Sequence, residues 1–203
     1  MLRREFLQRT ATSLALAGVG LSACTASVTP TASRSTNTDA GQGTATDKRR
    51  EINAGADATL DRLYTAVPNA RELVGKATGV LIFPRVLAAG LGIGGEYGEG
   101  VLRAQPTPNE YYSIGAMSIG PQAGAQSKAI ILLFMTPESL IRLRTSKGWS
   151  AGVDASVAIL KVGANGNIDT SSMSGPVLAF VLTNAGLMFN LSLEGTKITR
   201  AKF

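Results

Sequence analysis

Apolar residues between positions 47 and 67 recur at the spacing of an α-helix. Their steps of three and four residues predict an amphipathic helix from Asp47 to Val67, ended by Pro68. A second, short helix is predicted from Asn69 to Lys76. The apolar face of the first helix consists of Ile52, Ala56, Leu60, Leu63 and Val67.

Beyond residue 79 the pattern changes to the alternation of strands. The apolar run Val80 to Phe83 is expected to stop at Pro84. From Leu91 to Val101 large side chains alternate with glycines, so one strand face is nearly bare backbone. Glycine weakens a strand unless the absence of a side chain is needed for a bend or a close contact. The glycine pattern therefore predicts a sharply curved sheet, or a sheet against which a helix or strand packs closely. The later predicted strands are Glu110 to Met117, Lys128 to Met135, Ser150 to Val162, Pro176 to Thr183 and Leu187 to Leu193.

One further helix is predicted between these strands. Thr136 suits its N-cap and Pro137 its first position, with Leu140, Ile141 and Leu143 facing inward. Asn165-Gly166 and Asn184-Ala185-Gly186 are typical of tight turns, and strands joined by tight turns favour antiparallel pairing. The predicted fold class is therefore α+β: a Gly-rich, strongly curved antiparallel sheet or partial barrel with about three helices.

The N-terminal residues 1–23 have the pattern of a signal peptide. Arg3 and Arg4 precede an apolar stretch that is too short to span a ~30 Å hydrocarbon core. The run Leu21-Ser22-Ala23-Cys24 resembles the lipobox of bacterial lipoproteins, which implies acylation of Cys24. The run Arg3-Arg4-Glu5-Phe6-Leu7 resembles a twin-arginine signal. General export remains the alternative route, and a chance match is the alternative for each motif.

Residues 24–47 are expected to form the acylated Cys and a disordered tether, because they are rich in Thr, Ser, Ala and Gly without periodicity. Residues 48–203 have the length of one domain. A single cysteine forms no internal disulfide, and acylation accounts for a lone exported thiol. The residue after Cys24 is Thr25, whereas an Asp at this position would retain a lipoprotein at the inner membrane. We therefore expect the outer membrane, facing the periplasm, with the inner membrane as the alternative.

The charge of the chain favours anionic partners. It carries 20 Lys and Arg against 14 Asp and Glu. Loss of residues 1–23 removes three arginines and one glutamate, which lowers the formal charge from +6 to +4. At an acidic membrane each nearby Lys or Arg contributes about 1 kcal/mol. Nucleic acid is not expected, because no recognised binding pattern is present and the chain is predicted to be exported.

Two basic clusters are candidate lipid-binding residues. Lys48, Arg49 and Arg50 would form the first turn of the predicted helix, where positive charge opposes the macrodipole; the alternative is a solvated turn. The second cluster lies at the end of the later helix and includes an amphipathic tryptophan, typical of a membrane interface. Its alternative is a favourably charged helix end with a half-buried Trp. Its members are Arg142, Arg144, Lys147 and Trp149.

A further group of basic residues, Lys197, Arg200 and Lys202, lies in the last segment of the chain. We interpret it as part of an edge strand exposed to solvent, where lysines discourage aggregation between sheet edges.

The order of several motifs resembles the SYLF domain family, from about Val67 to Thr199. The resemblance implies binding of phosphoinositides and other acidic phospholipids through a basic surface and an N-terminal amphipathic helix. Bacteria generally lack phosphoinositides, and actin binding belongs to fungal relatives, so we expect acidic phospholipids and no actin-type partner. The motifs are Pro68 with Leu73, Gly79-Val80-Leu81-Ile82-Phe83-Pro84, Gly90 to Gly100 ending in Gly100-Val101-Leu102, Gly120 to Gln126, Gly152-Val153-Asp154-Ala155, and Gly186-Leu187 with Ser192-Leu193-Glu194-Gly195.

Catalysis, metals and cofactors are not expected. The sequence has no histidine, which excludes a Ser-His-Asp triad and imidazole ligands. The glycines from Gly90 to Gly95 fit GxGxxG, but a strand follows where a phosphate-binding helix must begin. Two carboxylate pairs are formal acid/base candidates, Glu96 with Glu99 and Asp154 with Glu194. A lipid-binding lipoprotein is therefore the main hypothesis, and a structural or protein-interaction lipoprotein the alternative.

Overall fold

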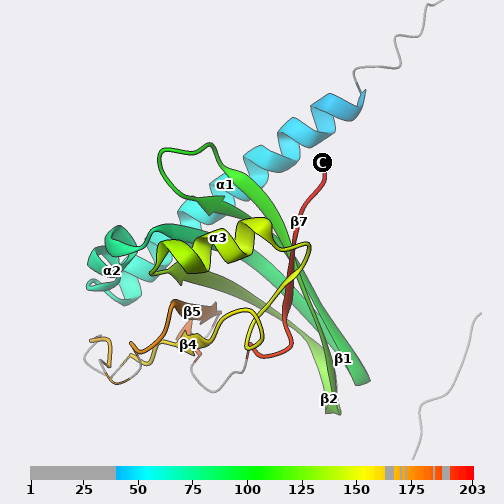
Figure 1. Cartoon of the computed structure of the whole chain (residues 1–203). Helices are drawn as coiled ribbons and strands as arrows, with labels where there is room; N and C mark the ends of the chain where they lie inside the picture. Colours follow the sequence, from blue (N-terminus) through cyan, green and yellow to red (C-terminus); the bar gives the residue numbers. More distant parts are fainter. Residues whose placement is uncertain (1–39, 163–166, 170, 172, 185, 189–192) are drawn as a thin grey trace, which may run out of the picture. The chain divides into compact units, whose positions relative to one another are not determined.

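The computed structural model describes residues 40–203, except 163–166, 170, 172, 185 and 189–192, and leaves the side chains of 40–42, 91–92 and 118–124 undescribed. In these residues, three helices lie against a strongly curled, mixed, seven-stranded sheet that forms a half-barrel (Figure 1). The predicted α+β class with a curved sheet is confirmed. The predicted signal peptide, Cys24 and residues 25–39 of the predicted tether lie outside the described residues.

Helix α1 spans Ala40–Ala66 and begins earlier than the predicted Asp47. Residues 40–47 are therefore helical, and their assignment to a disordered tether is wrong. Extending a formed helix fixes one residue per hydrogen bond, whereas starting one is costly, so a packed helix readily continues into a weakly helical segment. The predicted apolar face is buried at Ile52, Ala56, Leu63 and Val67. Helix α2, Ala70–Lys76, follows as predicted.

Two 25-residue strands form one long antiparallel hairpin: β1, Gly79–Arg103, and β2, Glu110–Phe134. The prediction that the first strand stops at Pro84 is wrong, because a register shift between Phe83 and Val86 accommodates the proline. The gap predicted between Met117 and Lys128 is also wrong. A second shift, opposite Leu91 and Ile93, lets β2 continue through that region. Proline is tolerated in a strand at such bulges, which also bend the sheet.

The glycine-bare face of β1 packs against the beginning of the same strand. A Cβ added at Gly98 would lie 2.7 Å from the Arg85 carbonyl oxygen. At Gly100 it would overlap the Ile82 carbonyl oxygen and lie 2.6 Å from Phe83 Cδ1. The close approach predicted from the glycine pattern is therefore confirmed, and the packed neighbour is β1 itself.

The remaining described strands are short. They are β3 (Trp149–Ser150), β4 (Val157–Ile159), β5 (Val177–Thr183), β6 (Gly186–Leu187) and β7 (Lys197–Arg200). The order is β3-β7-β2-β5-β4, with β1 also pairing with β2, and β6 with β5. β4 and β5 are parallel, so the sheet is mixed rather than wholly antiparallel as predicted. β7 lies between β3 and β2, so its prediction as an edge strand is wrong.

The predicted strand from Ser150 to Val162 is divided by a turn. Gly152 has a φ of 85°, and the backbone N–H of Ser150 donates to Asp154 Oδ2 at 2.6 Å. This side-chain hydrogen bond gives the backbone an alternative to the strand ladder. The strand predicted from Leu187 to Leu193 overlaps β6 at Leu187. Residues 189–192 of this prediction lie outside the described residues.

Helix α3, Pro137–Thr145, has the predicted cap. Thr136 Oγ1 accepts a hydrogen bond from the backbone N–H of Ser139 at 3.2 Å. Leu140 and Leu143 are buried, but Ile141 is exposed, so its prediction as an inward-facing residue is wrong. The helix therefore packs on the sheet through a narrow apolar stripe, in which Leu140 and Leu143 are three residues apart.

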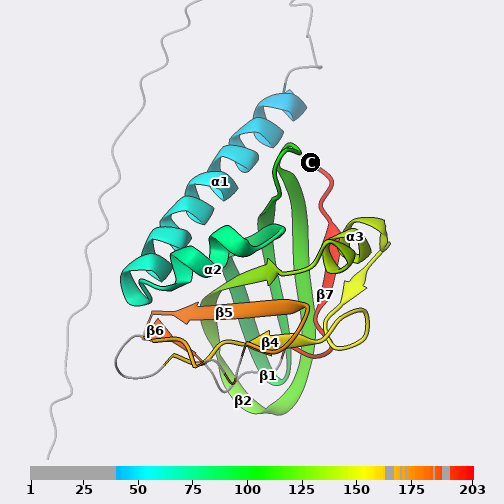
Figure 2. The same cartoon turned by 60° about the vertical axis from the view of Figure 1, so that its left-hand side comes forward.

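Hydrophobic residues fill both faces of the sheet. On one face α1 and α2 pack on residues such as Ile82, Val101 and Phe180. On the other, α3 and the segment around Trp149 cover Phe83, Leu102 and Phe134. Figure 2 shows α1 running along the curled hairpin, with α3 on the far side of the sheet.

Candidate functional site

A groove of about 470 Å³ lies between α1 and β1. Its α1 wall consists of positions separated by steps of one, three and four residues, which form one stripe along the helix. From Lys48 to Arg62 this wall is about 21 Å long at 1.5 Å per residue. The lining residues are Lys48, Glu51, Ile52, Gly55, Ala58, Thr59, Arg62, Pro84, Arg85, Leu87, Tyr97, Gly98 and Glu99.

Helix α1 and strand β1 approach each other closely at one point of the groove lining. A Cβ on Gly55 would lie 3.0 Å from Pro84 Cβ, so a larger residue would push the helix away from the strand. Apolar side chains remain open on the strand side of the groove: Leu87 is 49% exposed and Tyr97 is 59% exposed. The result is an accessible apolar wall beside a packed helix.

An ion pair ties the N-terminal part of the groove together. Lys48 Nζ lies 2.7 Å from Glu99 Oε2, and the Tyr97 hydroxyl donates to Glu99 Oε1 at 3.0 Å. The hydrogen bond to Glu99 raises the pKa of Lys48. Partial burial raises the pKa of Tyr97, and the neighbouring Glu99 carboxylate adds to this shift. The charge of Lys48 is therefore largely balanced within the protein.

Two arginines of the groove lining have no carboxylate partner among the described residues, against one unpaired carboxylate, Glu51, so the groove lining keeps a net positive charge. Arg62 Nη2 donates to the Thr183 carbonyl oxygen at 3.1 Å, which positions an exposed guanidinium without neutralising it. The side chain of Arg85 is exposed and makes no hydrogen bond or ion pair with any residue that the structure describes. A guanidinium carries five donors in a fork that matches a phosphate. The groove thus combines open arginine donors with an apolar wall.

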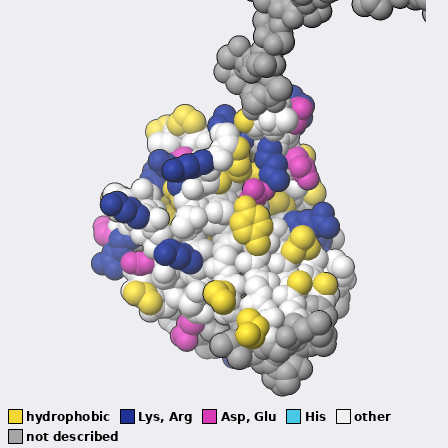
Figure 3. Space-filling view, turned by 90° about the vertical axis from the view of Figure 1, so that its right-hand side faces the viewer, with side chains coloured by type: hydrophobic (Ala, Val, Ile, Leu, Met, Phe, Trp, Pro, Cys, Tyr) yellow, Lys and Arg dark blue, Asp and Glu magenta, His cyan; other side chains and the backbone are white. Residues whose placement is uncertain are grey.

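The apolar surface continues beyond the groove along the hairpin. Ile93 is 66% exposed and Met117 is 85% exposed. Strand alternation and the pairing of Met117 with Gly95 place both on the sheet face that carries Leu87 and Tyr97. Figure 3 shows hydrophobic side chains scattered over one face of the molecule, with Lys and Arg side chains nearby.

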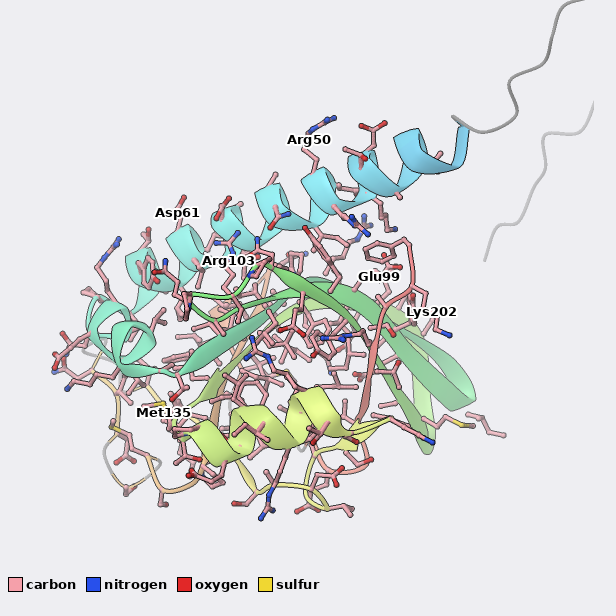
Figure 4. All side chains as sticks on the ribbon, turned by 45° about the horizontal axis from the view of Figure 1, so that its top comes forward. Arg50, Asp61, Glu99, Arg103, Met135 and Lys202 are labelled. Carbon is pink, nitrogen blue, oxygen red and sulfur yellow. The ribbon has the colours of Figure 1, made fainter. Side chains whose placement is uncertain are left out.

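The first predicted basic cluster lies within α1, not at its first turn. Lys48 pairs with Glu99, and Arg49 donates to the Phe203 carbonyl oxygen at 2.7 Å, with its guanidinium 5.6 Å from the Tyr111 ring centre. Arg50 Nη1 lies 2.7 Å from Asp47 Oδ1, and its side chain points away from the sheet (Figure 4). The three cations therefore do not form one shared patch of free charge.

The second predicted cluster is also divided by internal contacts. Arg142 donates to the Asp154 carbonyl oxygen at 3.1 Å. Arg144 Nε donates to Glu110 Oε1 at 2.7 Å, and Glu110 also pairs with Arg200 of the third basic group. Lys147 is exposed and has no hydrogen bond or ion pair among the described residues.

The assignment of Trp149 to a membrane interface is wrong, because its side chain is fully buried. Its ring packs edge-on against Phe134 with the centroids 6.0 Å apart. Its indole Nε1 has no hydrogen-bond partner among the residues that the structure describes. Trp149 is therefore a core residue that contributes packing rather than lipid contact.

Three of the four candidate carboxylates make structural contacts with other described residues. Glu96 and Glu99 lie on opposite strand faces and pair with Lys128 and Lys48 respectively. Asp154 accepts the turn hydrogen bond from Ser150. In the described part of the chain, no helix is long and apolar enough to cross a membrane, and no group of acidic or thiol side chains is placed to hold a metal ion.

Sequence reasoning missed Arg62 and Arg85. Arg62 continues the stripe of positions 48, 52, 55 and 59 along the edge of the apolar helix face, so helical spacing alone was a usable signal for it. Arg85 follows Pro84, where the strand was expected to stop, so its placement beside the helix depended on the bulge.

The family comparison covers the C-terminal part of this fold. Residues 115–202 match the model of the Ysc84 family, described as Las17-binding protein actin regulator, which is a SYLF-domain family. This match supports a SYLF domain in the C-terminal part of the chain. The matched range begins within β2 and includes α3 and β3 to β7, whereas α1 and β1, which line the groove, precede it. No curated protein matches the chain.

Proposed function

We propose that this chain is a membrane-anchored lipoprotein whose SYLF domain binds acidic phospholipids. The observation that carries the proposal is the groove surface, where Arg62 and Arg85 present open donors beside the exposed Leu87 and Tyr97. A phospholipid surface offers phosphate oxygens next to apolar chains, so it complements both features at once. Lys48, from the first predicted cluster, borders this surface.

Membrane attachment in this proposal comes from acylation of Cys24. Two or three acyl chains hold a protein far more firmly than a single chain, at about 0.8 kcal/mol per buried CH₂. The affinity of the domain then serves recognition of lipid rather than delivery to the membrane. The proposed location is the bacterial outer membrane, facing the periplasm.

Vesicle co-sedimentation tests the lipid binding. The full chain carrying Cys24→Ser, which removes the anchor, is mixed with phosphatidylcholine vesicles with or without phosphatidylglycerol. We expect preference for the acidic vesicles at about 0.1 M salt and loss of most of that preference near 1 M, because the Debye length falls from about 10 to about 3 Å. Equal binding to both vesicles at low salt would refute the proposal.

A protein-interaction role is the second candidate. The glycine-bare face is occupied by β1 itself, so it is not available to a partner. The exposed Ile93 and Met117 are the observation that favours a protein partner, since exposed apolar surface is typical of interaction sites. The vesicle assay separates the candidates, because a protein-docking surface predicts no salt-sensitive preference for acidic lipid.

A further inference from the structure

We infer that the groove between α1 and β1 binds a single phospholipid molecule, with its phosphate at Arg62 and one acyl chain along the apolar wall. This inference rests on the proposed function and makes it more specific. Adhesion to a charged bilayer needs only surface arginines, whereas capture of one lipid needs a cavity of matching length and polarity.

The dimensions of the groove fit one acyl chain. Its volume of about 470 Å³ lies within the roughly 300–1,000 Å³ of small-molecule sites. The α1 wall is about 21 Å long at 1.5 Å per residue. A single leaflet contributes about 15 Å to a bilayer core of ~30 Å. One extended chain can therefore lie along the wall without leaving the groove.

The polarity of the groove orients the lipid. The part near Lys48 is bridged by the ion pair with Glu99 and also carries Glu51, whose carboxylate has no cation partner among the described residues and repels a phosphate. Arg62 lies at the opposite end of the helix wall and is positioned by Thr183. Its guanidinium offers paired N–H donors, the geometry that recognises phosphate oxygens, and Arg85 adds positive charge on the strand side of the same groove. The phosphate is therefore expected at the Arg62 end, with the acyl chain directed towards Lys48.

The apolar wall distinguishes a lipid from free phosphate. Leu87 and Tyr97 are about half exposed and have nothing to contact in an ion complex. Each methylene that moves from water onto this wall contributes about 0.8 kcal/mol. Two additional methylenes therefore tighten binding about tenfold, since 1.4 kcal/mol is one factor of ten.

Titration calorimetry with soluble single-chain lipids tests the inference. Hexanoyl and octanoyl glycerol phosphate, below their micelle concentrations, are titrated into the full chain carrying Cys24→Ser, with glycerol phosphate as the headgroup control. We expect one site per chain and about tenfold tighter binding of the octanoyl lipid. Equal affinity for all three compounds would show a phosphate site only and overturn the inference.

A matched pair of variants locates the site. Ala58 lines the groove, and Ala54, one turn earlier on the exposed surface of α1, does not. Ala58→Trp fills the groove and is expected to weaken octanoyl binding at least tenfold, whereas Ala54→Trp leaves it within twofold. Both substitutions are at exposed helical positions, and urea midpoints verify that both variants fold. Unchanged lipid affinity in Ala58→Trp would contradict the inference.

The two proposals fail in different ways. If single lipids do not bind but the chain still prefers acidic vesicles, the groove inference is wrong and surface binding stands. If neither the single lipids nor the acidic vesicles are preferred, the proposed function itself is wrong. Loss of single-lipid binding in Ala58→Trp with vesicle preference retained would support both.

Discussion

Gly100→Ala should destabilise the domain, because the curl of β1 leaves no room for one methyl group. The added Cβ would overlap the Ile82 carbonyl oxygen and lie 2.6 Å from Phe83 Cδ1. A backbone carbonyl cannot rotate away as a flexible side chain can. The beginning of β1, or the paired stretch of β2, would therefore have to move.

The magnitude follows from two opposing effects. Inserting a methyl group into a well-packed region costs typically 1–3 kcal/mol, occasionally more. Replacing glycine by alanine also restricts the unfolded chain, which stabilises by about 0.4–1 kcal/mol. Gly95→Ala carries the same second effect, but its Cβ would lie 3.9 Å from the Ala116 oxygen, which is ordinary contact. The difference between the variants therefore isolates the clash, at about 1–3 kcal/mol.

Urea unfolding monitored by circular dichroism measures this difference. Both variants are made in the full chain carrying Cys24→Ser, and their unfolding free energies are compared at similar m-values. Gly100→Ala is expected to unfold at lower urea than the parent, and Gly95→Ala at equal or higher urea. Equal stability of the two variants would refute the account of β1 packing on itself.

Three further outcomes are expected from the core and the polar contacts of the domain. Trp149 emission should be that of a buried indole and should not shift when acidic vesicles bind; a shift would place the ring at the lipid surface. Glu96→Gln should lower the unfolding free energy by a few kcal/mol, because Lys128, whose side chain is 8% exposed, would lose its ion-pair partner at 2.8 Å. Replacing Glu96 and Lys128 together by apolar residues should restore most of the lost unfolding free energy. A double-mutant cycle that shows no coupling between the two residues would contradict this. Burial raises the pKa of the Tyr112 phenol above its ordinary 10.0, so Tyr112 ionises at a lower pH in the unfolded chain than in the folded domain. The protonated phenol therefore contributes to the unfolding free energy below pH 10, and this contribution is lost as the pH rises through the folded-state pKa. Tyr112→Phe should therefore flatten the fall in unfolding free energy between about pH 9 and pH 11, and an unchanged slope would count against that assignment.

The sequence predicted the local elements where one periodicity dominates. The stripe from Ile52 to Val67 predicted α1, and Thr136 with Pro137 predicted the start of α3. The glycine alternation up to Gly100 predicted close packing on one strand face. Each of these features depends on neighbours within a few turns or on the alternation of a single strand.

The errors occur where distant segments decide the structure. Pro84 stays within β1 because the partner strand allows a bulge, which no local pattern shows. Trp149 is buried because Phe134 and the sheet cover it, whereas the neighbouring charges suggested a surface. Arg85 joins Arg62 only through the packing of α1 on β1. The binding surface was therefore sought at clusters in sequence, and the groove brings together residues that are far apart in the chain.

Co-sedimentation with phosphatidylglycerol vesicles of two charge-matched variants tests the central claim most directly. Arg62→Gln with Arg85→Gln, and Arg142→Gln with Lys147→Gln, each remove two positive charges from the full chain carrying Cys24→Ser. At about 1 kcal/mol per cation near an acidic membrane, loss of the groove pair should weaken binding roughly thirtyfold, since each 1.4 kcal/mol is a factor of ten. The second pair should leave binding within a few-fold of the parent. Equal losses would show that overall charge alone attracts the domain, and a larger loss in the second pair would place the lipid surface at α3 instead of the groove.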